Sequence, residues 1–232
     1  MNLKEQAAQH ALSFVQDGMI LGLGSGSTSA IFVDLLGEKI KDEALKDIVG
    51  VPTSEETARH ARGLGIPLSS LADLAEKHGK PVLDLAVDGA DEVDPRLNLI
   101  KGLGRAALRE KIVEMHARRF IVIVDESKIV ARLGRGPVPV EIIPFESPIH
   151  IAWLNSLGCR AEQWLETDGS PVTTDNGNYL VRCWFEGGIA DAYALSHTLN
   201  ERPGIVEHGI FLDLASQVII AGQDGIRILE RN

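Results

Sequence analysis

Four carboxylates crowd into the segment LAVDGADEVD, directly after an apolar run. Because like charges repel, such a segment requires a ligand, an acid–base reaction or full exposure to water. Its glycine directly follows the first aspartate, whereas a helix–loop–helix calcium loop needs glycine at the sixth position. A magnesium ion shared with a substrate phosphate stays open as an interpretation. We expect Asp88 and Asp91, nearest the apolar run, to be site residues, and Glu92 and Asp94 to be solvated.

The segment GLGSGSTS, residues 22–29, is a glycine-rich turn between a predicted strand and a predicted helix. Amides and hydroxyls at a helix N-terminus suit a phosphate group. The segment is not a dinucleotide fingerprint, because Ser27 replaces the third glycine, and it lacks the Gly-Lys-Ser/Thr of a P-loop. It predicts a monophosphate cradle, and a tight structural turn is the alternative. The cradle would consist of Ser25, Gly26, Ser27 and Thr28.

The segment KGLGRAALREKIVEMHARR places Lys101 before a second glycine turn and Glu110 within the helix that follows. On a helical wheel two apolar stripes appear, which predicts a helix buried on two sides. One stripe consists of Ala106, Glu110, Val113 and Ala117, and the other of Leu108, Ile112 and Met115. A buried carboxylate is costly unless it is paired or used, and burial makes it a better base. The alternative is a surface glutamate paired with Arg109 or Lys111.

Other catalytic patterns find little support in the chain. The seven histidines show no metal-ligand spacing, and no Gly-x-Ser-x-Gly nucleophile turn occurs. Cys159 and Cys183 lie outside the glycine-rich strand ends, and two cysteines in a chain of 232 residues are more typical of free thiols than of a bridge. Nucleophilic catalysis is therefore not predicted.

The composition limits the functional classes. The net charge of -10 argues against non-specific nucleic-acid binding, and 44% hydrophobic residues are enough for a buried core. No apolar run approaches the ~18 residues of a membrane-spanning helix. The first residues form an amphipathic helix pattern rather than a signal peptide. We expect a cytoplasmic protein.

Strands and helices alternate through the first half of the chain, which predicts a mainly parallel sheet with helices on both faces. Ligands of such sheets bind outside the carboxyl ends of the strands. Four polar segments follow predicted strands: GLGSGSTS, PTSEE, DGADE and DESK. The predicted strands are 19–24, 47–52, 81–88 and 120–125, and the predicted helices are 3–16, 27–40, 53–65 and 105–119.

The pattern changes after about residue 134, where prolines accumulate. Asn176-Gly177 lies between β-prone runs and predicts a hairpin with a type I′ turn. Helical patterns at 147–157 and 189–200 flank this hairpin, and the last apolar runs are expected to rejoin the first sheet. We predict a main domain formed by 1–133 and 208–232, and a small α+β domain formed by 134–207.

Five motifs, GLGSGSTS, VDGADEVD, KGLGRAALREK, DESK and VTTDNGN, follow one another in the order and spacing of the type A ribose-5-phosphate isomerase family. The chain resembles this family over nearly its whole length. The resemblance implies a Rossmann-like main domain and a ferredoxin-like small domain. It implies an intramolecular oxidoreductase that interconverts D-ribose 5-phosphate and D-ribulose 5-phosphate through an enediolate in the pentose phosphate pathway, without cofactor or metal. It also suggests a homodimer or homotetramer.

By position in the family motifs, Glu110 would be the general base, Asp88 would assist ring opening and Lys101 would stabilise the enediolate. Asp91 would orient hydroxyl groups. The resemblance implies that the substrate contacts are Lys4, Ser25, Gly26, Ser27, Thr28, Asp88, Gly89, Ala90, Asp91, Lys101, Gly102, Leu103, Gly104 and Lys128. The chain departs from the family where Leu103 and Arg105 interrupt a run of small residues. Leu103 would narrow the approach to substrate, and Arg105 would contact an anion or face solvent.

Two other classes compete with the isomerase. A sugar-phosphate-sensing regulator of related fold would carry a DNA-binding helix-turn-helix, but the chain has room for only one helix before the first strand. A coenzyme-A-transferase-like enzyme would need a carboxylate nucleophile and a wider pocket, and no separate motif provides either.

Overall fold

The computed structural model describes residues 2–231, and the chain divides into two compact units. Unit 1 comprises Met1–Ala90, Arg109–Lys128 and Asp213–Asn232, and unit 2 comprises Asp91–Leu108 and Ile129–Leu212. Residues 213–231 lie in the same unit as residues 2–90. Unit 2 includes residues 91–108, 129–133 and 208–212, which the predicted boundaries assign to the main domain.

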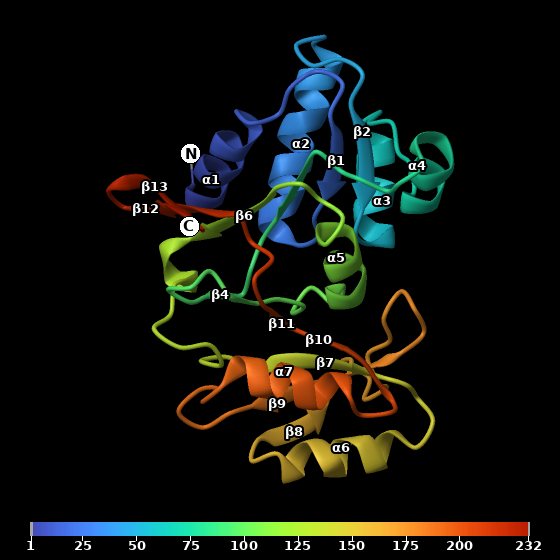
Figure 1. The fold of residues 1–232 in the computed structure, drawn as a ribbon, viewed down its shortest axis with the longest axis vertical. Coiled ribbons are helices and arrows are strands. Elements are labelled where there is room, and N and C mark those ends of the chain that lie inside the picture. Colours follow the sequence, from blue (N-terminus) through green and yellow to red (C-terminus); the bar gives the residue numbers. More distant parts are fainter. Residues whose placement is uncertain (1, 232) are drawn as a thin grey trace. The chain divides into compact units, whose positions relative to one another are not determined.

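Unit 1 is built on a six-stranded sheet of order β13-β12-β6-β3-β1-β2 (Figure 1). Its strands are β1 (Ile20–Leu23), β2 (Val49–Pro52), β3 (Leu85–Asp88), β6 (Phe120–Asp125), β12 (Gln217–Gly222) and β13 (Gly225–Glu230). All neighbours pair in parallel except β12 and β13, which pair antiparallel. The predicted mainly parallel sheet is confirmed. Central strands are buried on both faces, which explains their continuous apolar runs.

Helices cover both faces of this sheet. On one face α1 (Leu3–Leu12), α2 (Ser27–Lys41) and α3 (Glu55–Gly63) contribute to a core that includes Leu21, Leu85 and Ile121. On the other face α4 (Leu71–His78) and α5 (Ala107–Glu114) contribute Leu74 and Val113 to a second cluster. Figure 1 shows α1 beside α2, in agreement with their contacts. The alternation of residues along each strand produces the two faces.

The helices differ from the sequence-based expectations in two places. α4 was not predicted from the sequence. The helix predicted over 105–119 extends only from Ala107 to Glu114, and its second stripe is not buried, because Ile112 is 44% exposed and Met115 is 63% exposed. The N-cap residue of α2 is Gly26 at φ 96°, and no side chain caps this helix.

Unit 2 contains a four-stranded antiparallel sheet of order β10-β7-β9-β8 and two helices (Figure 1). The elements follow as β7 (Val138–Ile142), α6 (Ser147–Ser156), β8 (Arg160–Gln163), β9 (Tyr179–Trp184), α7 (Ala192–Asn200) and β10 (Ile205–His208). This βαββαβ succession is the ferredoxin-like arrangement, as the resemblance implied. A second, three-stranded sheet joins β4 (Glu92–Val93), β5 (Leu99–Ile100) and β11 (Ile210–Phe211).

The predicted hairpin at Asn176-Gly177 exists, but its turn differs from the prediction. Thr173 and Tyr179 form an antiparallel bridge, and Gly177 N–H donates to Thr174 O at 2.9 Å. Gly177 has φ 79°, whereas Asn176 is not among the residues with positive φ. A type I′ turn needs positive φ at both central residues, so this is a three-residue loop ending in a left-handed glycine.

Cys159 and Cys183 are free and buried in unit 2, which confirms the prediction of free thiols. A hydrogen bond with Cys159, together with burial, raises the pKa of Cys183 far above its usual range.

Candidate active site

The glycine turn of unit 1 leads from β1 directly into the first turn of α2. Gly26 takes a positive φ of 96°, a region that favours glycine, and no side chain caps the helix. The ammonium group of Lys4 donates to Ser27 Oγ at 2.8 Å. Exposed backbone and hydroxyl groups at the start of a helix, next to a lysine, form an arrangement that suits a phosphate.

The side chain of Ser25 does not take part in this arrangement. Its hydroxyl forms hydrogen bonds with Thr53 Oγ1 at 2.8 Å, Ser54 Oγ at 2.8 Å and Thr57 Oγ1 at 3.1 Å. Thr57 Oγ1 in turn donates to the carbonyl of Gly24 at 3.1 Å. This hydroxyl cluster fastens the glycine turn to the start of α3. The predicted strand-end segment PTSEE contains Thr53 and Ser54, but the sequence did not predict that they hold the hydroxyl of Ser25.

Asp88 ends β3 and is only 1% exposed. Its Oδ1 accepts hydrogen bonds from Ser29 Oγ at 2.6 Å and from Gly89 N–H at 2.7 Å. Gly24 lies so close that a Cβ built on it would be 2.1 Å from Oδ1. Ala90 and Gly89 follow Asp88 and are half-buried. Asp88 thus lies at a strand end, as the sequence predicted, and the structure adds that its carboxylate is buried.

Glu110 lies in the first turn of α5 and is 3% exposed, so the alternative of a surface ion pair is wrong. Arg109 pairs with Glu55 at 2.8 Å. Val113, on the same stripe as Glu110, is 5% exposed. The predicted apolar stripe around Glu110 therefore faces the interior.

The direction of α5 brings Glu110 toward the carboxyl end of β3. Leu83 N–H, just before β3, donates to the carbonyl of His116 at 2.9 Å. Three residues back, Val113 Cγ1 would lie 3.0 Å from a Cβ built on Gly22, beside the Cβ of Ala86. The helix α5 therefore runs antiparallel to the strand β3, so earlier residues of α5 lie nearer the carboxyl end of β3. One turn before Val113, Glu110 points to the strand end that Asp88 occupies.

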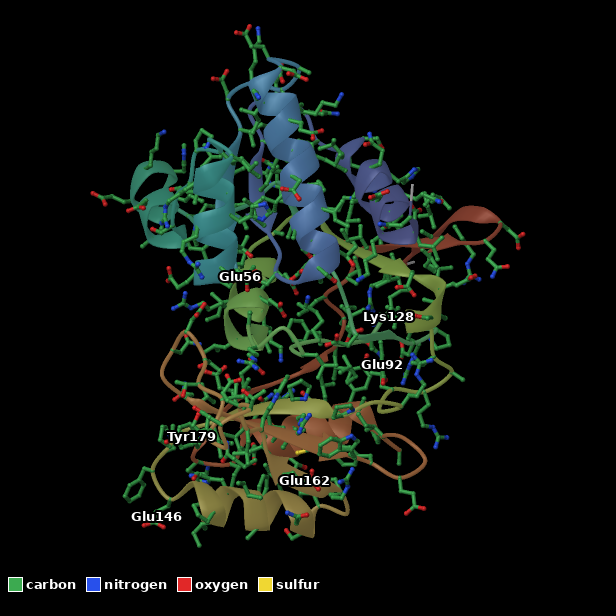
Figure 2. The ribbon with its side chains drawn as sticks, turned by 180° about the vertical axis from the view of Figure 1, so that it is seen from behind. Glu56, Glu92, Lys128, Glu146, Glu162 and Tyr179 are labelled. Atoms are coloured by element: carbon green, nitrogen blue, oxygen red, sulfur yellow. The ribbon has the colours of Figure 1, made fainter. Side chains whose placement is uncertain are left out.

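Lys128 is the last of the candidate site residues in unit 1. It lies in a short 3₁₀ turn, Glu126–Lys128, directly after β6, and is half-buried (Figure 2). β6 neighbours β3 in the sheet, so the carboxyl ends of both strands lie at the same edge. Unit 1 thus places Lys128, Asp88 and the glycine turn at one edge of its sheet.

The remaining candidates belong to unit 2. Asp91 Oδ2 accepts from the backbone N–H of Leu103 at 3.0 Å, so Asp91 fastens the loop that follows Lys101. Lys101 is 2% exposed, its N–H donates to Gly209 O at 2.9 Å, and its ammonium lies 5.5 Å from the centre of the Phe211 ring. Leu103 is 37% exposed.

The interrupted glycine run keeps the geometry of a glycine turn. Gly102 has φ 99°, and a Cβ there would lie 2.8 Å from Ala107 Cβ; Gly104 is exposed. Arg105 adopts φ 70°, a conformation that favours glycine. Its guanidinium binds Glu166 Oε1 at 2.5 Å and Oε2 at 3.2 Å. Arg105 therefore pairs with a carboxylate of its own unit, while its side chain remains 41% exposed to solvent.

The prediction of a solvated carboxylate is wrong for Glu92. Glu92 is 3% exposed and accepts hydrogen bonds from the backbone N–H groups of Gly134, Arg135 and Gly136, at 2.7, 3.3 and 2.5 Å. Asp94 is half-buried, and its Oδ1 accepts from Arg96 N–H and Asn98 N–H at 2.8 Å each. The two carboxylates stabilise turns.

Within residues 2–231, no three His, Cys, Asp or Glu side chains gather in a way that would hold a metal ion. Over the same residues, no helix combines the length and apolar character needed to cross a membrane.

A buried aspartate at a strand end, a buried glutamate on the helix that runs back toward it, and a lysine-flanked glycine turn share one edge of an open α/β sheet. This combination is typical of α/β enzymes that act on small phosphorylated substrates.

Comparison with known proteins narrows this class. The family model for ribose 5-phosphate isomerase A (phosphoriboisomerase A) matches residues 49–225. Ribose-5-phosphate isomerase A of Roseiflexus castenholzii is 49% identical, and the match covers 98% of this chain and 94% of that protein. The chain belongs to the ribose-5-phosphate isomerase A family, and it is an isomerase of the pentose phosphate pathway. The regulator and coenzyme-A-transferase alternatives are thereby set aside.

Solved structures agree with this membership. A D-ribose-5-phosphate isomerase in complex with phospho-erythronic acid superposes with a TM-score of 0.94 and 45% identity, covering 100% of both chains. The ribose 5-phosphate isomerase of Plasmodium falciparum superposes with a TM-score of 0.92 and 38% identity, covering 98% of this chain and 97% of that one.

Proposed function

We propose that this chain interconverts D-ribose 5-phosphate and D-ribulose 5-phosphate by proton transfer through an enediolate, with Glu110 as the base. The burial of Glu110 at 3% exposure, on a helix directed toward the strand end of Asp88, is the observation that carries this assignment. A carboxylate sheltered from water is a stronger base than an exposed one. One carboxylate suffices, because it takes the proton from C2 and returns it to C1.

Asp88 is proposed to assist ring opening. In that step the proton of the anomeric hydroxyl is removed, the bond between C1 and the ring oxygen breaks, and the ring oxygen receives a proton. A carboxylate fixed by Ser29 and Gly89 can take the first proton and supply the second. Asp91, which fastens the loop after Lys101, is proposed to orient substrate hydroxyl groups.

Lys101 is proposed to stabilise the enediolate oxygen. Its side chain is buried and its backbone is fixed by Gly209, so its positive charge is held in place before the reaction begins. A preorganised charge of this kind stabilises a developing oxyanion by several kcal/mol, on the order of 3 to 4 in comparable sites. The backbone of Gly102, Leu103 and Gly104 is proposed to line the substrate beside it.

The phosphate is proposed to bind at the glycine turn, through the backbone and hydroxyls of Gly26, Ser27 and Thr28, with Lys4 and Lys128. The Lys4–Ser27 contact of 2.8 Å supports this assignment. Ser25 contributes its backbone, because its hydroxyl is engaged with Thr53, Ser54 and Thr57. Gly89 and Ala90 are proposed as backbone contacts after Asp88. The related isomerase was solved in complex with phospho-erythronic acid, a ligand that, like the proposed substrate, carries a phosphate.

The experiment that tests the proposal follows ribose 5-phosphate by NMR in the presence of the pure protein and a chelator. Appearance of ribulose 5-phosphate is expected, and its absence would contradict the proposal. Glu110→Gln should abolish exchange of the substrate C2 hydrogen with deuterated water. Glu114→Gln is a matched control, because Glu114 is equally buried at 3% on the same helix and should retain exchange. Normal exchange in Glu110→Gln would refute the assignment of the base.

A homodimer or homotetramer is proposed for the assembly. Phe145 and Ile149 in unit 2 are 74% and 56% exposed, and large apolar side chains of this kind are common at interfaces between subunits. Light scattering coupled to size exclusion should give a mass of two or four chains, and a monomer would contradict the proposal. A cytoplasmic location is proposed from the two free thiols, and fractionation of cells tests it.

A further inference from the structure

Ser29 is a buried hydroxyl that the proposed reaction does not yet use. It lies in the first turn of α2, directly after Thr28, and is 0% exposed. The next buried residues of this helix, Phe32 and Val33, are apolar and pack into the core of unit 1. Burying a hydroxyl at such a position is costly unless it is hydrogen-bonded. The partners of Ser29 therefore indicate its role.

Those partners are Asp88 and Gly89. Ser29 Oγ donates to Asp88 Oδ1 at 2.6 Å, and Gly89 N–H donates both to Ser29 Oγ at 3.1 Å and to Asp88 Oδ1 at 2.7 Å. The three groups form a closed triangle in which the serine hydroxyl both donates and accepts. Because Oδ1 is held by two donors, this oxygen is fixed relative to α2 and to the end of β3.

The backbone of Gly24 packs against the carboxyl group of Asp88 from the side of the glycine turn. A Cβ at this position would lie 2.1 Å from Asp88 Oδ1 and 2.5 Å from Asp88 Cβ. The carboxyl group therefore cannot rotate toward β1 without meeting the backbone. Ser29 and Gly24 together confine Asp88 to a narrow range of orientations.

We propose that Ser29 is a positioning residue for the ring-opening step, because it holds one oxygen of Asp88 and thereby aims the carboxyl group at the sugar. This inference rests on the proposed role of Asp88. Proton transfer to and from the ring requires aligned atoms, and a small misplacement slows such a step strongly. Ser29 itself exchanges no proton with the substrate.

The chemistry of the two sugars allows the role to be isolated. Ribose 5-phosphate closes to a furanose, so its conversion requires ring opening. Ribulose 5-phosphate is acyclic, because its C5 oxygen carries the phosphate and cannot attack the C2 carbonyl. Removal of a proton from C1 of ribulose 5-phosphate therefore tests the base, whereas net conversion between the two sugars tests the base and the ring step together.

The test compares Ser29→Ala with the wild type in deuterated water. Net conversion of ribose 5-phosphate is expected to fall about ten- to a hundredfold, the loss typical of one hydrogen bond to a charged group. Exchange of the C1 hydrogen of ribulose 5-phosphate is expected to remain near the wild-type rate. Ser29→Thr keeps the hydroxyl and should restore net conversion.

Val33→Ala is the matched control, because it removes buried side-chain atoms one turn further along α2 without touching Asp88. Thermal unfolding of both variants measures any loosening of the helix. The inference is overturned if Ser29→Ala converts ribose 5-phosphate at the wild-type rate, or if exchange and conversion fall together in Ser29→Ala and Val33→Ala alike. Asp88→Asn distinguishes failure of the proposed role of Asp88 from failure of the proposed role of Ser29. Normal conversion in Asp88→Asn would refute the role of Asp88. Slow conversion in Asp88→Asn together with full activity in Ser29→Ala would refute only the role of Ser29.

Discussion

Replacement of Glu92 by Gln should destabilise unit 2, although Glu92 has no proposed part in the reaction. The carboxylate is 3% exposed and accepts three backbone hydrogen bonds from a turn more than forty residues away in the chain. Oε2 accepts from Gly134 and Arg135, and Oε1 accepts from Gly136. The side chain therefore ties β4 to the turn before β7.

The magnitude follows from what the amide can replace. Its carbonyl oxygen can accept from Gly134 and Arg135, but its NH₂ group then faces the N–H of Gly136. One buried donor loses its acceptor at a cost of about 1 to 3 kcal/mol, and the other two bonds lose their ionic character. The free energy of unfolding should fall by about 2 to 5 kcal/mol. For a chain of this size the midpoint temperature should fall by about 5 to 15 °C.

Urea unfolding followed by circular dichroism measures this change. Glu162→Gln is the matched control in the same unit, because Glu162 has a 46% exposed side chain and pairs with Arg160 at 2.6 Å on the surface (Figure 2). Loss of an exposed pair should cost no more than about 1 kcal/mol. The reasoning is refuted if the two variants unfold at the same urea concentration.

Four further outcomes are expected. Lys4→Ala should raise KM for ribose 5-phosphate about tenfold or more with little change in kcat, since it removes a charge beside Ser27, whereas Lys39→Ala near the far end of α2 should leave steady-state kinetics unchanged. Gly24→Ala should abolish most net conversion, because a Cβ would lie 2.1 Å from Asp88 Oδ1, and a fully active variant would contradict this packing. Arg105→Gly should change the free energy of unfolding by less than about 1.5 kcal/mol, because relief of the left-handed backbone conformation offsets loss of the ion pair with Glu166. A larger loss of unfolding free energy in a denaturant titration would contradict this compensation. Cys183 should resist iodoacetamide at neutral pH in the folded protein and react after unfolding, because its hydrogen bond with Cys159 and its burial raise its pKa and disfavour the reactive thiolate. Mass spectrometry detects the adduct, and rapid labelling of Cys183 in the folded protein would contradict this account.

The resemblance and the local pattern were enough to predict the family, the parallel sheet and the helices on both of its faces. Continuous apolar runs identify strands buried on both faces, and a 3.6-residue period places Glu110 on an inward stripe with Val113. These signals are local, because each depends on residues within one or two turns of the chain. The position of Asp88 at a strand end follows from the same logic, since polar residues after buried strands meet at one edge of a parallel sheet.

Tertiary structure decided the features that depend on partners far away in the sequence. Glu92 was predicted to be solvated, but the amides of Gly134 to Gly136 accommodate its charge, and no spacing within LAVDGADEVD reveals those amides. The outer stripe of α5 shows the opposite error, because Ile112 and Met115 are apolar and yet exposed. Whether a stripe is covered depends on neighbouring elements, not on the helix that carries it.

The same division applies to the proposed site. The sequence by itself determined which groups are available: the carboxylates of Asp88 and Glu110, the lysines, and the glycine turn with its hydroxyls. Only the fold decided their orientation, because the hydroxyl of Ser29 lies 59 positions from the carboxylate it holds, and the hydroxyl of Ser25 turns to Thr53 and Ser54. Chemical type is a property of each residue, whereas direction and burial arise when segments distant in the chain pack together.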